Sequence, residues 1–126
     1  MSANTDLVDR FIAAWKTKDV DPIVSFFHDD AAYTKGPIDP PNRGIEAIRT
    51  MIGGFLGMAQ AMEFVVHHSA ENAAAGIVMN ERTDRFQVGE RWVELPVMGV
   101  FELREGKIQA WRDYFDLAQF QNGMAG

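Results

Sequence analysis

The chain has 126 residues, no cysteine and a formal net charge of −6 at pH 7. This length predicts one domain over residues 1–126. Because 12 Lys and Arg are outnumbered by 18 Asp and Glu, we expect no nucleic-acid partner. The lack of Cys excludes thiol catalysis and thiolate metal sites. No signal-peptide pattern and no membrane-spanning apolar run is present, so we expect a cytoplasmic protein without membrane contact.

The N-terminal half predicts three helices. Apolar residues recur at helical spacing over 7–15. An Asp-Pro start signal predicts a short helix over 22–28, and a third helix is expected over 44–57. Between these helices, residues 31–34 are expected to be extended. Three prolines within 36–42 predict a loop, because proline lacks the N–H that a helix or a strand ladder needs.

The C-terminal half has the pattern of strands. Runs rich in β-branched and aromatic residues predict strands at 62–68, 74–88, 91–103 and 108–115, followed by a helical tail over 116–121. Helices followed by long strands indicate an α+β fold. We expect a strongly curved, mixed but mostly antiparallel sheet packed on three N-terminal helices. Such a sheet forms a cone with an internal pocket, a cystatin-like α+β roll.

Strand alternation places ionisable residues among apolar ones. Arg82 and Asp84 are expected on one face of their strand, and Gln109, Trp111 and Asp113 on one face of the last strand. Buried charges are unfavourable unless they are paired, so Arg82 is the expected partner of both Asp84 and Asp113. Two carboxylates on one arginine can serve as general acid and general base. The alternative is an ordinary cross-strand salt bridge on an exposed face.

Three segments then carry a resemblance to a known family: Glu81-Arg82-Thr83-Asp84, Gly99-Val100-Phe101-Glu102-Leu103 and Gly106-Lys107-Ile108-Gln109-Ala110-Trp111-Arg112-Asp113-Tyr114-Phe115-Asp116. They closely resemble the limonene-1,2-epoxide hydrolase family, and the resemblance covers essentially the whole chain. It implies a nuclear-transport-factor-2-like cone, also used by polyketide cyclase-like proteins. It further implies opening of epoxides to diols in one step, without a cofactor, a metal or a covalent intermediate.

The resemblance also implies residue roles. Asp113 matches the base that deprotonates water, and Asp84 matches the acid that protonates the epoxide oxygen. Arg82 matches the arginine that bridges the two, and Tyr33 matches a tyrosine that helps to hold the water. The family's Tyr-x-Asn-x-Pro pattern has Lys35 in place of its asparagine here. A lysine only donates hydrogen bonds, so Lys35 either turns to solvent or enters the pocket and changes the substrate or the reaction.

The expected function is therefore cofactor-independent hydrolysis of an apolar, cyclic epoxide to a diol. The alternatives are a related acid/base enzyme of the same fold (isomerase, dehydratase or polyketide cyclase-like) and a non-catalytic dimer that binds a small ligand. A homodimer through the outer sheet face is expected from the resemblance and from Trp92 and Met98, which share a strand face. His67 and His68 should point to opposite faces of a strand, which disfavours a metal site.

Overall fold

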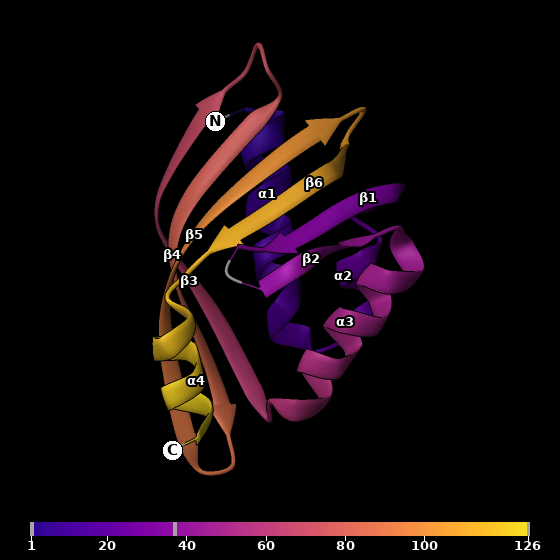
Figure 1. Cartoon of the computed structure of the whole chain (residues 1–126). Coiled ribbons are helices and arrows are strands. Elements are labelled where there is room, and N and C mark those ends of the chain that lie inside the picture. Colours follow the sequence, from indigo (N-terminus) through magenta and orange to yellow (C-terminus); the bar gives the residue numbers. More distant parts are fainter. Residues whose placement is uncertain (1, 37, 126) are drawn as a thin grey trace.

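The structure, a computed structural model, describes residues 2–36 and 38–125 (Figure 1). Its helices are α1 (Ala3–Ala14), the 3-10 turn η1 (Trp15–Thr17), α2 (Val20–Val24), α3 (Ile45–Met58) and α4 (Leu117–Ala125). Its strands are β1 (Phe27–Lys35), β2 (Ile38–Arg43), β3 (Ala61–Asn72), β4 (Ile77–Val88), β5 (Arg91–Arg104) and β6 (Lys107–Tyr114). Within the described residues, every helix is too short or too polar to cross a membrane.

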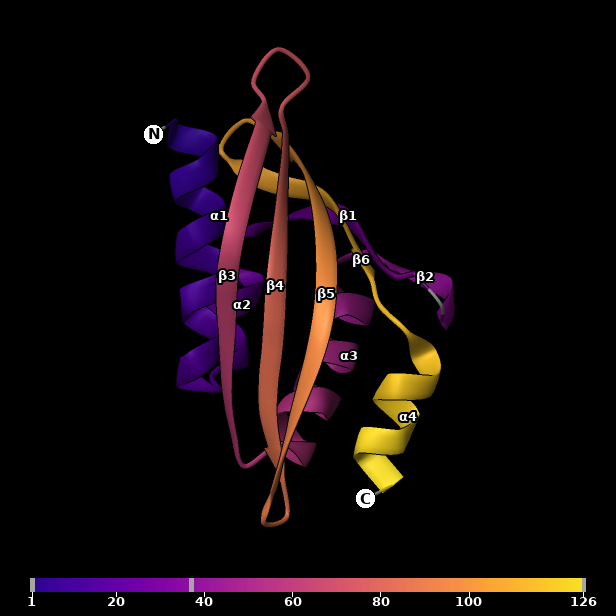
Figure 2. The ribbon, with the colours of Figure 1, turned by 90° about the vertical axis from the view of Figure 1, so that its left-hand side faces the viewer.

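The strands form one six-stranded sheet in the order β2-β1-β6-β5-β4-β3. All neighbours are antiparallel except β1 and β6, which run parallel. Figure 1 shows the sheet bending around α1 and α3, and Figure 2 shows α1, α2 and α3 behind the long strands, with α4 to one side. The predicted fold class, a curved mixed sheet on three N-terminal helices, is confirmed.

An aromatic cluster fills the space between α1 and the sheet. Phe11 of α1 is fully buried and meets the rings of Phe27, Phe101 and Trp111 edge to face, with centroids 5.4, 6.0 and 5.0 Å away. Such T-shaped pairs stabilise a core beyond the area that they bury. The cluster therefore fixes α1 against β1, β5 and β6, the strands that carry much of the site described below.

The predicted loop over 36–42 is wrong. Residues 38–43 form β2, an edge strand paired with β1 through Ile38, Asn42 and Arg43. An edge strand tolerates proline because one side of its backbone needs no ladder partner. Neither Pro40 nor Pro41 is a register partner of β1, and the ladder shifts where they lie. Pro37 lies outside the described residues.

The helix predicted over 22–28 ends early. α2 stops at Val24, and Phe27 already begins the nine-residue β1. Phe27 is buried and pairs with Ile108 of β6. A pairing between distant parts of the chain therefore overrides the local helical pattern, and the predicted extended piece over 31–34 becomes part of a longer strand.

Gln109 does not share the inner face of β6 with Trp111, as simple alternation predicted. The ladder runs from Glu102–Ala110 directly to Leu103–Ile108, which leaves Gln109 without a partner. This extra residue turns Ile108 inward, where it is fully buried, and lets Gln109 bond to exposed side chains. Bulges of this kind redirect side chains. From Trp111 onward the predicted alternation holds.

Candidate active site

Arg82 joins two carboxylates on the inner face of the sheet. Its Nε and Nη2 donate to the two oxygens of Asp84 at 2.9 and 3.0 Å, and Nη2 also donates to Asp113 Oδ2 at 2.9 Å. The exposed fractions of Arg82, Asp84 and Asp113 are 1%, 7% and 4%. The alternative of an exposed cross-strand salt bridge is therefore wrong, and the three charged groups form a buried set.

Gly99 allows this set to form. It lies on β5, between Asn80 of β4 and Asp113 of β6, and is the register partner of both. A Cβ on Gly99 would collide with Arg82 Nη1 and stand 2.9 Å from Asp113 Oδ1. The absent side chain lets the guanidinium pass over β5 to reach β6. Sequence reasoning did not single out this glycine, although a glycine inside a strand is a sign of close approach.

Two further side chains orient the set. Asn80 Oδ1 accepts a hydrogen bond from Arg82 Nη1 at 2.9 Å, and Trp111 Nε1 donates to Asp113 Oδ1 at 2.7 Å. Asn80 stands two residues before Arg82, and Trp111 stands two residues before Asp113. Side chains two residues apart on a strand lie on the same face. This spacing could have indicated from the sequence that Asn80 orients Arg82 and that Trp111 orients Asp113. Each carboxylate oxygen of Asp113 thus receives one donor.

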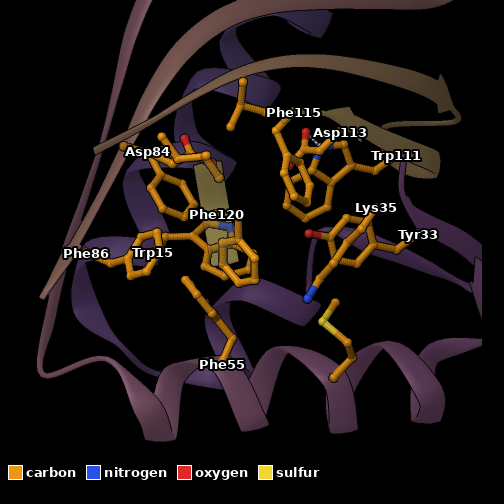
Figure 3. Close-up of a pocket in the computed structure, with 14 residues that line it drawn as sticks. Trp15, Tyr33, Lys35, Phe55, Asp84, Phe86, Trp111, Asp113, Phe115 and Phe120 are labelled. Atoms are coloured by element: carbon orange, nitrogen blue, oxygen red, sulfur yellow. Dashed lines mark hydrogen bonds between the residues drawn. The ribbon is translucent and has the colours of Figure 1, made fainter. Parts of the chain in front are cut away.

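Tyr33 is positioned beside Asp113 because both side chains contact Trp111. Its ring stacks on the ring of Trp111 with centroids 4.1 Å apart and planes 5° apart. Figure 3 shows its hydroxyl pointing into the pocket. The stack fixes the phenol on the same wall as Asp113, so all four matched residues of the family motif meet at one site.

The pocket lies between the inner face of the sheet, α3 and α4 (Figure 3). Asp84, Asp113, Tyr33 and Lys35 supply polar groups. The other lining residues are mainly apolar: Trp15, Met51, Phe55, Phe64, Phe86, Leu95, Val97, Trp111, Phe115 and Phe120. A largely apolar cavity with a few convergent polar groups is the usual make-up of a site for small organic ligands.

Burial sets the protonation of the site. It raises the pKa of Asp113 to about 6, helped by the charge of Asp84 and opposed by Arg82 and by the bond from Trp111. Burial and the charge of Asp113 hold the pKa of Tyr33 well above its usual range, so its hydroxyl keeps its proton. Burial by itself lowers the pKa of Arg82, but the two carboxylates raise it above normal. Arg82 is thus a permanent cation between the two acidic side chains.

Lys35 lines the pocket and does not turn away to solvent. It stands two residues after Tyr33 on β1, and its Cα is the register partner of Asp113. The N–H of Gly36 donates to the backbone oxygen of Asp113 at 2.5 Å and holds this register. Burial lowers the pKa of Lys35, and the charge of Asp113 opposes that shift. The residue that departs from the family pattern therefore lies inside the site.

His67 and His68 lie outside the pocket and both line one surface hollow with Glu81 and Thr83. The prediction that they point to opposite faces of the strand is therefore wrong. His67 Nε2 forms a hydrogen bond of 2.8 Å with Thr83 Oγ1, and the ladder shifts between Val66 and His68. In the described part of the chain, no group of three or more His, Cys, Asp or Glu side chains is arranged to hold a metal ion.

Fold and site together define a class. A curved α+β cone whose pocket holds two carboxylates on one buried arginine has the groups that general acid and base catalysis on a small molecule requires. Because many chemistries share such cones, the site and not the fold carries this conclusion.

Comparisons with known proteins specify the family. The limonene-1,2-epoxide hydrolase catalytic domain matches residues 2–125. Epoxide hydrolase EphG of Mycobacterium tuberculosis is 32% identical over 123 residues, which cover 93% of this chain and 76% of EphG. The chain belongs to the limonene-1,2-epoxide hydrolase family, and epoxide hydrolysis is the activity that this membership supports.

Solved structures agree on the fold. An M. tuberculosis epoxide hydrolase of the same type superposes with a TM-score of 0.83 at 28% identity, covering 98% of this chain and 90% of that one. An NTF2-like protein from Burkholderia pseudomallei gives a TM-score of 0.87 at 16% identity over 100% of both chains, which shows the fold alone. The expected family and the nuclear-transport-factor-2-like cone are confirmed.

Proposed function

We propose that this protein hydrolyses an apolar, cyclic epoxide to a diol in one step, with water as the nucleophile and no covalent intermediate. The observation that carries the proposal is the bonding of one buried arginine, Arg82, to Asp84 and Asp113 at the wall of an apolar pocket. A binder of apolar ligands gains nothing from two buried carboxylates, whose burial is unfavourable.

Each member of the site has one task in this reaction. Asp113 takes a proton from a water that Tyr33 helps to hold, and the water oxygen forms a bond to an epoxide carbon. The bond between that carbon and the epoxide oxygen breaks, and the oxygen takes the proton of Asp84. A proton then passes from Asp113 back to Asp84 through solvent. A base with a pKa of about 6 is suited to work near neutral pH.

Arg82 supports both roles. It holds the two carboxylates in fixed positions, so neither must be ordered during the reaction. The proposed reaction requires a proton on Asp84 and an ionised Asp113, and like charges that share one site disfavour double ionisation. The strain of the three-membered ring supplies driving force, and general acid and base catalysis supplies the remaining acceleration.

Turnover in heavy-oxygen water tests the one-step route. We expect the diol from a single turnover, with enzyme in excess, to carry one labelled oxygen, because water attacks carbon directly. A carboxylate nucleophile would instead transfer an unlabelled protein oxygen in that first turnover. Mass spectrometry of the diol distinguishes the two. Unlabelled diol rejects the one-step mechanism, and consumption of the epoxide without diol favours an isomerase or cyclase of the same fold.

We further propose a homodimer through the outer face of the sheet. Trp92, Met98 and Tyr114 are exposed on that face, with exposed fractions of 44%, 41% and 50%. Exposed apolar side chains gathered on one face are typical of an interface. We expect sedimentation velocity at micromolar concentration to give a dimer, and Met98→Glu to shift it toward monomer. A monomeric wild-type protein under these conditions contradicts this proposal.

A further inference from the structure

Lys35 is a charged pocket residue to which the proposed hydrolysis gives no task. It follows Tyr33 by two residues on β1, and Figure 3 shows its ammonium ending inside the cavity. The ion pairs of Asp84 and Asp113 are both made to Arg82. Among the described residues, the Lys35 ammonium has neither an ion-pair partner nor a hydrogen-bond acceptor. A positive group thus faces the cavity with its donors unused.

The surroundings of Lys35 are apolar on the side away from the carboxylates. Met51 and Phe55 of α3 and Phe120 of α4 line the same cavity. A cation moved out of water is unfavourable unless a counter-ion or an acceptor replaces the lost hydration. The lowered pKa of Lys35 reflects this burial. An anion delivered by a ligand would supply the missing partner.

Arg82 is unable to take that anion. Its Nε and Nη2 already donate to Asp84, and Nη2 also donates to Asp113. Its Nη1 donates to Asn80. Four of its five N–H donors are thus used, and Arg82 is not among the residues that line the cavity. Of the lining residues in the described structure, Lys35 is the cation available to a ligand.

We propose that the substrate is an epoxide that also carries a carboxylate, bound with the carboxylate on Lys35 and the epoxide ring at Asp84 and Asp113. This inference rests on the proposed function and changes its substrate from a wholly apolar epoxide to one with an apolar, cyclic body and a single charged group. A reversed pose would set the ligand carboxylate against the two acidic residues, which repel it. Attraction at one end and repulsion at the other therefore orient the substrate. One ammonium matches the single charge of a carboxylate, whereas a phosphate group carries a charge of about −1.5 to −2 and three strong acceptor oxygens.

Binding of unreactive probes tests the subsite without catalysis. Cyclohexanecarboxylate and cyclohexanecarboxamide match in shape and differ in charge. By calorimetry on the wild-type protein, we expect the carboxylate to bind roughly 10- to 100-fold more tightly, the size of a charge-assisted hydrogen bond. Lys35→Met should abolish this preference, and Lys35→Arg should retain it. Lys107→Met removes an exposed lysine at the start of β6 and should change nothing.

Kinetics with matched epoxides separates this inference from the proposed function. An epoxycyclohexane carboxylate and its carboxamide are compared by kcat/KM in the wild type and in Lys35→Met. We expect wild type to favour the acid about 10-fold or more, the size of one charge-assisted contact, and Lys35→Met to lose this preference.

If both epoxides are hydrolysed equally and both probes bind equally, the carboxylate subsite is wrong and epoxide hydrolysis stands. If neither epoxide is hydrolysed but the carboxylate probe binds through Lys35, the subsite stands and the proposed function fails. If Lys35→Met changes kcat/KM equally for the acid and the amide epoxides and also shifts the pH profile, Lys35 acts by changing the pKa of Asp113. That result would overturn the subsite.

Discussion

Replacing Asp113 by Asn is expected to abolish epoxide hydrolysis while the protein keeps its fold. Asn has the shape of Asp but cannot take a proton from water, so the loss should reach at least the roughly 10²–10⁴-fold typical of general base removal. Diol formation at saturating epoxide measures it. Asp29→Asn, which changes an exposed carboxylate on β1, is the matched control and should keep full activity. Near-normal turnover by folded Asp113→Asn would reject Asp113 as the base.

The same variant has a characteristic pH dependence of stability. Because the pKa of Asp113 is raised to about 6 in the folded protein, the folded state binds more protons than the unfolded state between about pH 4 and pH 6. The contribution of Asp113 to the free energy of unfolding of the wild-type protein therefore falls as pH rises through that window. Asn cannot titrate, so the stability of Asp113→Asn relative to wild type should increase from pH 4 to pH 7. Thermal unfolding at both pH values measures the difference, and a constant difference contradicts the raised pKa.

Arg82→Met is expected to cause the largest loss of stability. The side chain is buried and pairs with both Asp84 and Asp113, so its removal leaves the buried pair of acids without its counter-ion. Breaking a buried ion pair in this way costs about 3–5 kcal/mol. Chemical denaturation at pH 7 measures this loss. Activity should be lost as well, because nothing then holds the acid and the base in place.

The control and the pH dependence make this prediction specific. Arg85→Met removes an arginine that pairs with Glu63 and Glu94 on the outer face and should change stability little, because exposed pairs contribute weakly. Without Arg82 the pKa of Asp113 rises further, so protonation below pH 6 relieves the buried charge. The loss caused by Arg82→Met should therefore shrink as pH falls from 7 to 5. An equal loss at both values would show that packing, not charge, is the main contribution of Arg82.

Local pattern was sufficient for much of this protein. The period of two in β4 places Arg82 and Asp84 on one buried face, and the same period relates Trp111 to Asp113. Each pair is separated by two residues along one strand, so its geometry follows from the backbone alone. The family motif added the match of Tyr33 and the roles proposed for the two acids. The fold class followed from helices preceding long strands.

Only the tertiary structure decided how these parts meet. Arg82 reaches Asp113 across an intervening strand because Gly99 offers no side chain there, and a sequence does not show which strands flank one another. The direction of Lys35 depends on the parallel pairing of β1 with β6, two segments far apart in the chain. The same pairing made β1 longer than its local pattern indicated. Contacts between distant segments have no local period, so their consequences for the site emerged only from the folded chain.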